Sequence, residues 1–215
     1  EQELVISGVR CDTRTPKHWL KASRLVDAYD VKADLMALLE EAGIDSSKVQ
    51  LSTQNIPNWF HPGRSALVQQ GPKRILGVFG EIHPQILKDM DAPFPLVAFE
   101  FYVDRITFKR RTHAKSFLNI SPLQGLDRDF AFLVPESVSA EILMQAVKKA
   151  DPQLIEGIDI FDVFRGKGIP EGMKSVAVNI RLQPRDKTLT EEDLTALMAA
   201  VKERVEKDTG GVLRS

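Results

Sequence analysis

Residues 155–182 read IEGIDIFDVFRGKGIPEGMKSVAVNIRL, two strand patterns joined by a loop that contains three glycines. From Lys174 to Leu182, branched apolar side chains alternate with small or polar ones. The apolar set is therefore expected to face a core and the other set to face away from it. The first pattern, Ile155–Arg165, leaves two alternatives open. Its core set is either Phe161 and Val163, or Ile158, Ile160, Asp162 and Phe164.

Further strand and helix patterns flank this pair. Arg128–Val134 alternates as a strand, and Ser139 is suited to cap a helix that follows it. Thr190 with Asp193 resembles a capping box that begins a second helix, and Val212–Arg214 can form a short last strand. The resulting order, β-α-β-β-α-β, predicts a ferredoxin-like split βαβ domain over residues 127–215.

The first half, residues 1–110, is predicted to be an antiparallel sheet with few helices, which makes the chain α+β. Apolar residues at helical spacing predict a helix over Asp30–Ala42, and Pro84 suits the first turn of a short helix at His83–Asp89. Strand patterns occur at Leu4–Val9, Val49–Thr53, Ser65–Gln69, Ile75–Phe79 and Leu96–Tyr102. Because the sequence starts without Met and within a strand pattern, we expect a fragment of a longer protein.

Composition limits the possible functions. The 215 residues include 29 Lys and Arg, 30 Asp and Glu, and one cysteine, with a formal net charge of −1. The charge excludes a uniformly basic nucleic-acid binder, and the lone Cys11 favours a reducing compartment. The sequence contains no signal-peptide pattern and no apolar run long enough to span a membrane. Basic residues gather after Asp104, and residues 111–126 are interpreted as a basic linker.

The open face of the predicted second domain is the strongest candidate for binding. If Phe161 and Val163 face the core, Asp162 and Phe164 lie on that face beside Ser175 and Arg181. An aromatic ring can stack on an unpaired base, a carboxylate or hydroxyl can bond to its edge, and cations can hold phosphates. The alternative is that Phe164 belongs to the core and Arg181 is merely solvated.

Catalytic and metal sites find little support. His61, Glu81 and His83 could be imagined as a metal or acid–base site, but their spacing matches no metal motif, and packed or capping histidines are the better interpretation. Gly77–Gly80 lacks the pattern of a phosphate-binding loop. We predict no catalytic residue and no metal ligand in this chain.

Three motifs in the second half carry a family resemblance, namely Phe161–Gly166, Gly168–Ser175, and Thr188-Leu189-Thr190 before a helix. They resemble the ferredoxin-fold anticodon-binding domain that closes the β chain of bacterial phenylalanyl-tRNA synthetases, and Arg128-Asp129-Phe130 fits its first strand. The first half is similar to the preceding module of the same β chain. The motifs concerned are Asp27–Asp34 leading into Leu38-Leu39-Glu40, Phe60–Ala66, and Gly77–Pro84.

The resemblance implies a class II synthetase-like module without catalytic residues, followed by a domain that binds the tRNA anticodon. The positions that contact the first anticodon base, a G, fall on Asp162, Phe164 and Ser175. Tyr is common where Phe164 stands, and Phe keeps the stacking surface but lacks the hydroxyl. Three cations are predicted to contact the RNA backbone or base edges, namely Arg165, Lys174 and Arg181.

The resemblance also implies the partners: a phenylalanine-specific tRNA and a synthetase α subunit in an α2β2 assembly, with no DNA and no membrane. The module is expected to pack against the α subunit in the cytoplasm, and to support ATP-dependent attachment of phenylalanine without catalysing it alone. ATP and magnesium are expected on other modules, and no cofactor is expected here. The alternative is a purely structural module at the subunit interface. A metal-dependent enzyme built on His61, Glu81 and His83 is a third possibility.

Overall fold

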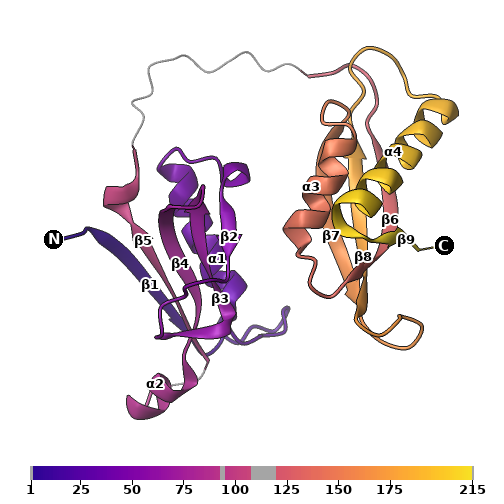
Figure 1. Ribbon diagram of the computed structural model, residues 1–215. Helices are drawn as coiled ribbons and strands as arrows, with labels where there is room; N and C mark the ends of the chain where they lie inside the picture. Colours follow the sequence, from indigo (N-terminus) through magenta and orange to yellow (C-terminus); the bar gives the residue numbers. More distant parts are fainter. Residues whose placement is uncertain (1, 93–94, 108–119, 215) are drawn as a thin grey trace. The chain divides into compact units, whose positions relative to one another are not determined.

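The computed structural model describes residues 2–92, 95–107 and 120–214, in two compact units that meet in sequence at Ala114 and Lys115 (Figure 1). Most of the predicted linker, residues 111–119, lies outside the described residues. Its last residue, Leu126, already begins the first strand of the second unit.

The first unit contains a five-stranded sheet in the order β1-β5-β4-β3-β2. Its strands are β1 (Val5–Cys11), β2 (Gln50–Ser52), β3 (Phe60–Gln70), β4 (Arg74–Ile82) and β5 (Leu96–Tyr102). Every neighbouring pair is antiparallel, which confirms the sheet type that the strand patterns predict.

Helix α1 (Ala28–Glu41) packs on this sheet through a fully buried stripe of Val31, Leu35 and Leu39. It begins two residues before the predicted start, because Asp27 and Asp30 form a capping box that satisfies the first free backbone N–H groups. The unit also contains the short helix α2 (Pro84–Asp89) and two 3₁₀ turns, η1 (Ser46–Lys48) and η2 (Val103–Arg105).

Strand β3 is longer than predicted, since it begins at Phe60 rather than at Ser65. Pro62 and Gly63 are turn-forming residues in sequence, and they hide this part of the strand from a pattern search. The pairing with β4 shifts register between Phe60 and Ser65, so an irregular stretch accommodates both residues within the strand.

The second unit has the predicted β-α-β-β-α-β order. It consists of β6 (Leu126–Pro135), α3 (Ala140–Ala150), β7 (Ile155–Phe164), β8 (Met173–Leu182), α4 (Glu191–Thr209) and β9 (Val212–Leu213). The antiparallel sheet has the order β7-β8-β6-β9, and α3 and α4 lie side by side over one of its faces (Figure 1). This arrangement confirms the ferredoxin-like prediction, and within residues 120–214 it leaves the opposite face of the sheet without a helix.

The helix-covered side of this sheet carries the core. Phe132, Val178, Ile180 and Leu182 are fully buried there, against Leu143 and Val147 of α3 and Val201 and Val205 of α4. Both predicted caps are present, because Ser139 Oγ accepts a hydrogen bond from Ile142 N and Thr190 forms a capping box with Asp193. The core therefore fixes which side chains of each strand point to the open side.

Candidate nucleic-acid interface

The direction of the β7 side chains is decided by a β-bulge. Ile158 and Ile160 pair with the buried Ile180 and Val178, so they face the core. The register then shifts between Ile160 and Asp162, which leaves Phe161 as the extra residue. Neither of the two alternatives left by the sequence is therefore right for the whole strand, because the core set changes parity at the bulge.

Beyond the bulge, Val163 pairs with the buried Val176, while Asp162 and Phe164 point to the other side. We call that side the open face. By register it carries Asp127, Asp129, Ala131 and Leu133 of β6, Gly157, Asp159, Asp162 and Phe164 of β7, Ser175, Ala177, Asn179 and Arg181 of β8, and Val212 of β9 with Arg214 after it.

Phe164, Ser175 and Leu133 lie in one row across β7, β8 and β6. Phe164 is 42% exposed, so part of its ring is accessible to a base. Ser175 is only 4% exposed, although its register places it on the open face as predicted. A small side chain between two larger neighbours is easily covered, and the guanidinium of Arg214 also reaches it, with Nη1 at 3.3 Å from Oγ.

Asp162 occupies the next row, opposite Ala177 and Ala131. Its neighbours in the row are therefore small, and its own side chain is exposed. The structure thus brings the three predicted base-contacting residues to one side of the sheet, in two adjacent rows. No bond between them is needed for such a surface, since each can present its own group to a ligand.

The open face is not generally basic. Its carboxylates are Asp127, Asp129, Asp159 and Asp162, and its cations are Arg181 and Arg214. One carboxylate is engaged, because Asn179 donates to Asp129 at 2.7 Å. Such a mixture suits reading of a base edge better than unselective attraction of phosphates.

The three predicted backbone contacts are not grouped together. Arg181 lies on the open face, with Nε 3.6 Å from a Glu156 carboxylate oxygen. Arg165 forms a two-pronged ion pair with Glu136, at 2.7 and 3.2 Å. These hydrogen bonds hold the pKa of Glu136 below its usual range and raise the pKa of Arg165. RNA contact by these cations stays a prediction.

Lys174 has a different position. By register it shares the helix-covered side with Val176 and pairs with the buried Val134. Its side chain is 12% exposed, and its ammonium donates to the Glu136 backbone carbonyl at 3.0 Å. Lys174 and Arg165 therefore both hold Glu136, at the end of the sheet where β6 leads toward α3.

Arg214 is the residue that sequence reasoning missed. The signal was available, because Val212–Arg214 was expected to be a strand, and alternate residues of a strand share a face. Leu213 packs against the core, and its two neighbours therefore belong to the open face. Arg214 is held there by its own backbone, which donates to the Ala131 carbonyl at 2.7 Å.

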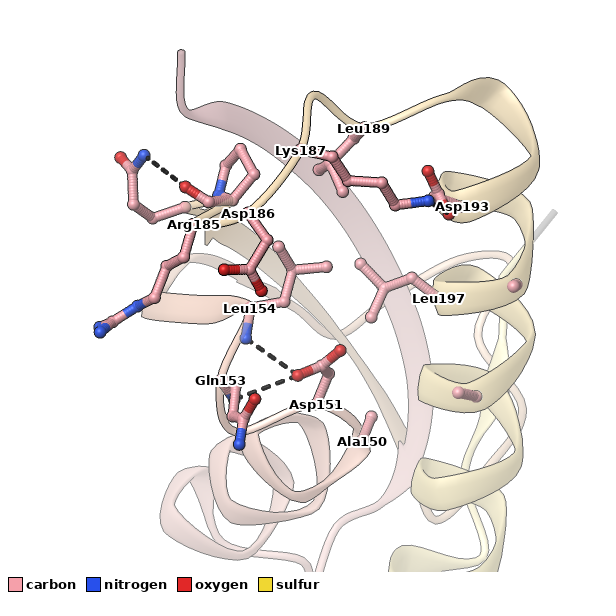
Figure 2. A pocket seen from close by; sticks show the side chains of 14 residues that line it. Ala150, Asp151, Gln153, Leu154, Arg185, Asp186, Lys187, Leu189, Asp193 and Leu197 are labelled. Atoms are coloured by element: carbon pink, nitrogen blue, oxygen red, sulfur yellow. Dashed lines mark hydrogen bonds and ion pairs between the residues drawn. The ribbon is translucent and has the colours of Figure 1, made fainter. Parts of the chain in front are cut away.

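A hollow in the second unit lies away from the open face (Figure 2). It has a volume of about 560 Å³ and is formed by the end of α3, the segment between β8 and α4, and the first turns of α4. Leu154, Leu189 and Leu197 line it, and Lys187 pairs with Asp193 at 2.9 Å. That ion pair, with the Thr190 bonds, lowers the pKa of Asp193 to about 2. None of the six predicted contact residues lines this hollow.

The imagined metal site is not assembled. His61 Nδ1 accepts from Gly63 N, His83 Nδ1 accepts from Gln85 N as a helix cap, and Glu81 pairs with Arg64. Over residues 2–92, 95–107 and 120–214, no three His, Cys, Asp or Glu side chains form a group that could hold a metal ion. Within the same ranges, no helix is long and apolar enough to cross a membrane.

Comparison with known proteins assigns both units. Residues 1–103 match the family model of the phenylalanyl tRNA synthetase beta chain CLM domain, and residues 121–214 match that of the ferredoxin-fold anticodon binding domain. The chain is 41% identical over 221 residues to the phenylalanine–tRNA ligase beta subunit of Bradyrhizobium diazoefficiens, and 41% identical over 220 residues to that of Rhodopseudomonas palustris. The subunit of Brucella abortus is 42% identical over 220 residues. These alignments cover 100% of the chain and 27% of each relative.

Proposed function

We propose that this chain, which consists of a phenylalanyl-tRNA synthetase beta chain CLM domain followed by a ferredoxin-fold anticodon-binding domain, binds the anticodon stem-loop of a phenylalanine tRNA through the open face. The observation that carries the proposal is the placement of Phe164, Ser175 and Asp162 in adjacent rows on one side of the sheet. The match of this unit to anticodon-binding domains supports the proposal.

The chemistry of the three side chains favours guanine as the base. The exposed part of the Phe164 ring offers a stacking surface for any base. The Watson–Crick edge of guanine carries two adjacent N–H donors and one carbonyl acceptor, and a carboxylate such as Asp162 accepts from donors only. A serine hydroxyl that accepts a bond from Arg214 can still donate one to an acceptor on the base.

The first unit has a different proposed role. Its relatives are beta subunits, so we propose that it packs against a synthetase α subunit in an α2β2 assembly in the cytoplasm. The ligation of phenylalanine to tRNA, with its ATP and magnesium, is proposed to take place on other parts of that assembly. This chain would contribute tRNA recognition and architecture.

The test is the binding of a fluorescent anticodon stem-loop to the full 215-residue chain. A stem-loop with the first anticodon base changed from G to A is the ligand control. We expect Phe164→Ala to weaken binding of the native loop by about 1–3 kcal/mol, the usual value of one stacked base. Val163→Ala is the matched protein control, because it removes an apolar side chain from the same strand on the opposite side of the sheet.

Equal affinity for the two loops, or equal effects of the two substitutions, would contradict base recognition by the open face. The chain would then act as a structural module of the subunit interface.

A further inference from the structure

The first unit carries a protruding segment that the proposed function does not use. Residues 13–26, which we call the basic arm, leave the end of β1 and return to the start of α1 (Figure 1). The two sides of the arm are joined near its base by backbone hydrogen bonds, from Arg14 N to Arg24 O and from Val26 N to Asp12 O, each at 2.9 Å. The base of the arm is therefore a short antiparallel pairing.

The base of the arm is fixed to α1 by one buried carboxylate. Asp30 is 7% exposed and pairs with Arg24 at 2.7 Å and with Arg14 at 3.2 Å. These bonds lower the pKa of Asp30, with the hydrogen bond from Arg24 as the largest cause. Arg24 also pairs with Asp27 at 3.1 Å, so both arginines at the base are engaged by carboxylates at the start of α1.

The tip of the arm is different in both charge and exposure. Trp19 is 89% exposed, and Lys17 and Lys21 stand on either side of it in sequence. No ion pair involves either lysine among the residues that the structure describes. Four residues of the arm are Lys or Arg and none is Asp or Glu. A polyanion could therefore approach the tip without being repelled by a carboxylate of the arm.

The aromatic ring at the tip is also preorganised. His18 lies against Trp19 with ring centroids 5.8 Å apart and the planes 25° from parallel. His18 is itself oriented, because its Nδ1 accepts a hydrogen bond from Leu20 N at 3.1 Å. An ordered aromatic ring between cations is the arrangement with which proteins stack unpaired bases and hold the adjacent phosphates.

We propose that the tip of the basic arm is a second RNA-contact surface, on which Trp19 stacks an unpaired base while Lys17 and Lys21 contact phosphates. The charge pattern favours RNA over a protein partner, because an exposed apolar tip for protein docking does not need cations on both sides and no acid along the arm. The surface belongs to the first unit, and its argument does not depend on anticodon recognition by the open face.

Tryptophan fluorescence tests the stacking directly, since the chain has only two tryptophans, Trp19 and Trp59. In the full chain with Trp59→Phe, we expect a short oligouridylate to quench the Trp19 emission in a saturable way. The matched control is Trp19→Phe, in which Trp59 is the only reporter and no quenching is expected. Heparin, a polyanion without bases, should bind the tip without quenching it. Absence of quenching by RNA, or equal quenching by heparin, would overturn the proposal.

Salt dependence tests the lysines. The plot of log association constant against log salt concentration has a negative slope. Replacing both lysines with glutamine should make that slope for the oligouridylate shallower by about 1.4, the value for two phosphate contacts on a single strand. An unchanged slope would also overturn the proposal. Phe164→Ala separates this proposal from the previous one, because it should weaken stem-loop binding and leave the Trp19 quenching by oligouridylate unaltered. Loss of that quenching in Phe164→Ala would assign the RNA contact to the open face.

Discussion

The guanidinium of Arg214 donates a hydrogen bond to the hydroxyl of Ser175 at 3.3 Å, although Ser175 is on β8 and Arg214 directly follows β9, with β6 between these two strands. The bond fixes a cation over a row of the open face in which Phe164 is the exposed aromatic residue. It also explains part of the low exposure of Ser175, which lies on the side of the sheet opposite α3 and α4. The open face therefore includes Arg214, which follows β9, as well as the β7–β8 hairpin.

We expect Arg214→Ala to weaken stem-loop binding by about 1.5–3 kcal/mol, the range for a hydrogen bond to a charged group. The substitution removes the guanidinium and also frees the Ser175 hydroxyl. Isothermal titration with the native stem-loop measures the loss. Arg128→Ala is the control, because it removes the same charge from the same domain on the helix-covered side of β6. If both variants lose the same affinity, Arg214 acts only through net charge.

Gly166 is expected to govern the position of the Phe164 ring. A Cβ at Gly166 would come within 3.2 Å of Phe164 Cζ, and the residue has a φ of +156°. Gly166→Ala should therefore displace the ring and weaken stem-loop binding, with a loss of stability of about 1 kcal/mol or more. Gly168→Ala provides the control, since its φ is +94° and a Cβ there meets nothing within 4 Å. We expect it to lower the unfolding free energy without lowering the affinity for RNA.

Arg181 and Lys174 are both predicted to contact the RNA backbone, but their substitutions should change the salt dependence of binding differently. Arg181→Gln, on the open face, should make the negative slope of log association constant against log salt concentration for the stem-loop shallower by about 0.7, the value for one lost phosphate contact. Lys174→Gln should leave that slope unaltered, because its ammonium is turned toward the Glu136 carbonyl on the other side of the sheet. Binding titrations over a series of salt concentrations distinguish these cases. A shallower slope for Lys174→Gln would show that this cation does reach the RNA.

The ion pairs of Asp30 should make stability depend on pH. Its folded pKa lies below the ordinary value of 3.8, so its stabilisation is complete above that value and is lost as the pH falls through the folded pKa. Asp30→Asn should cost about 1–3 kcal/mol at neutral pH, since it removes the charged acceptor from Arg24 and Arg14. Urea unfolding measures the cost.

The difference in unfolding free energy between Asp30→Asn and the parent chain should shrink in acid, as the pH falls through the folded pKa of Asp30. Asp34→Asn is the control on the same helix, because the pair of Asp34 with Arg10 is more exposed and should contribute less than about 1 kcal/mol. A difference for Asp30→Asn that stays constant with pH would exclude the carboxylate charge as its cause.

The order of elements in the second unit could be predicted because local signals agreed with the tertiary fold. The local signals are the Thr190–Asp193 capping box, the alternation of β8 and the glycine-rich loop. Each of them involves only a few neighbouring residues. The direction of the β7 side chains could not be predicted in the same way. A bulge between Ile160 and Asp162 is set by pairing with β8, and a single strand pattern carries no sign of it.

The residues of the candidate surface could be predicted from the sequence, but their exposure could not. Asp162, Phe164 and Ser175 followed from motif resemblance and from one of two parity alternatives, and the structure brings all three to the open face. The low exposure of Ser175 depends on Arg214, which is distant in sequence, so no local pattern could reveal it. The position of Lys174 was readable from the alternation of β8, because Lys174 has the same parity as Val176.

The bulge in β7 makes the chemistry of the open face a matter of strand pairing as well as of side-chain identity. If Phe161 were paired in a regular ladder instead of forming the bulge, the residues after Ile160 would exchange sides. The carboxylate of Asp162 and the ring of Phe164 would then turn toward the helices, and Val163 would face outward. A related domain with the same residues, but without the bulge, would thus offer an aliphatic surface in place of a base-reading one.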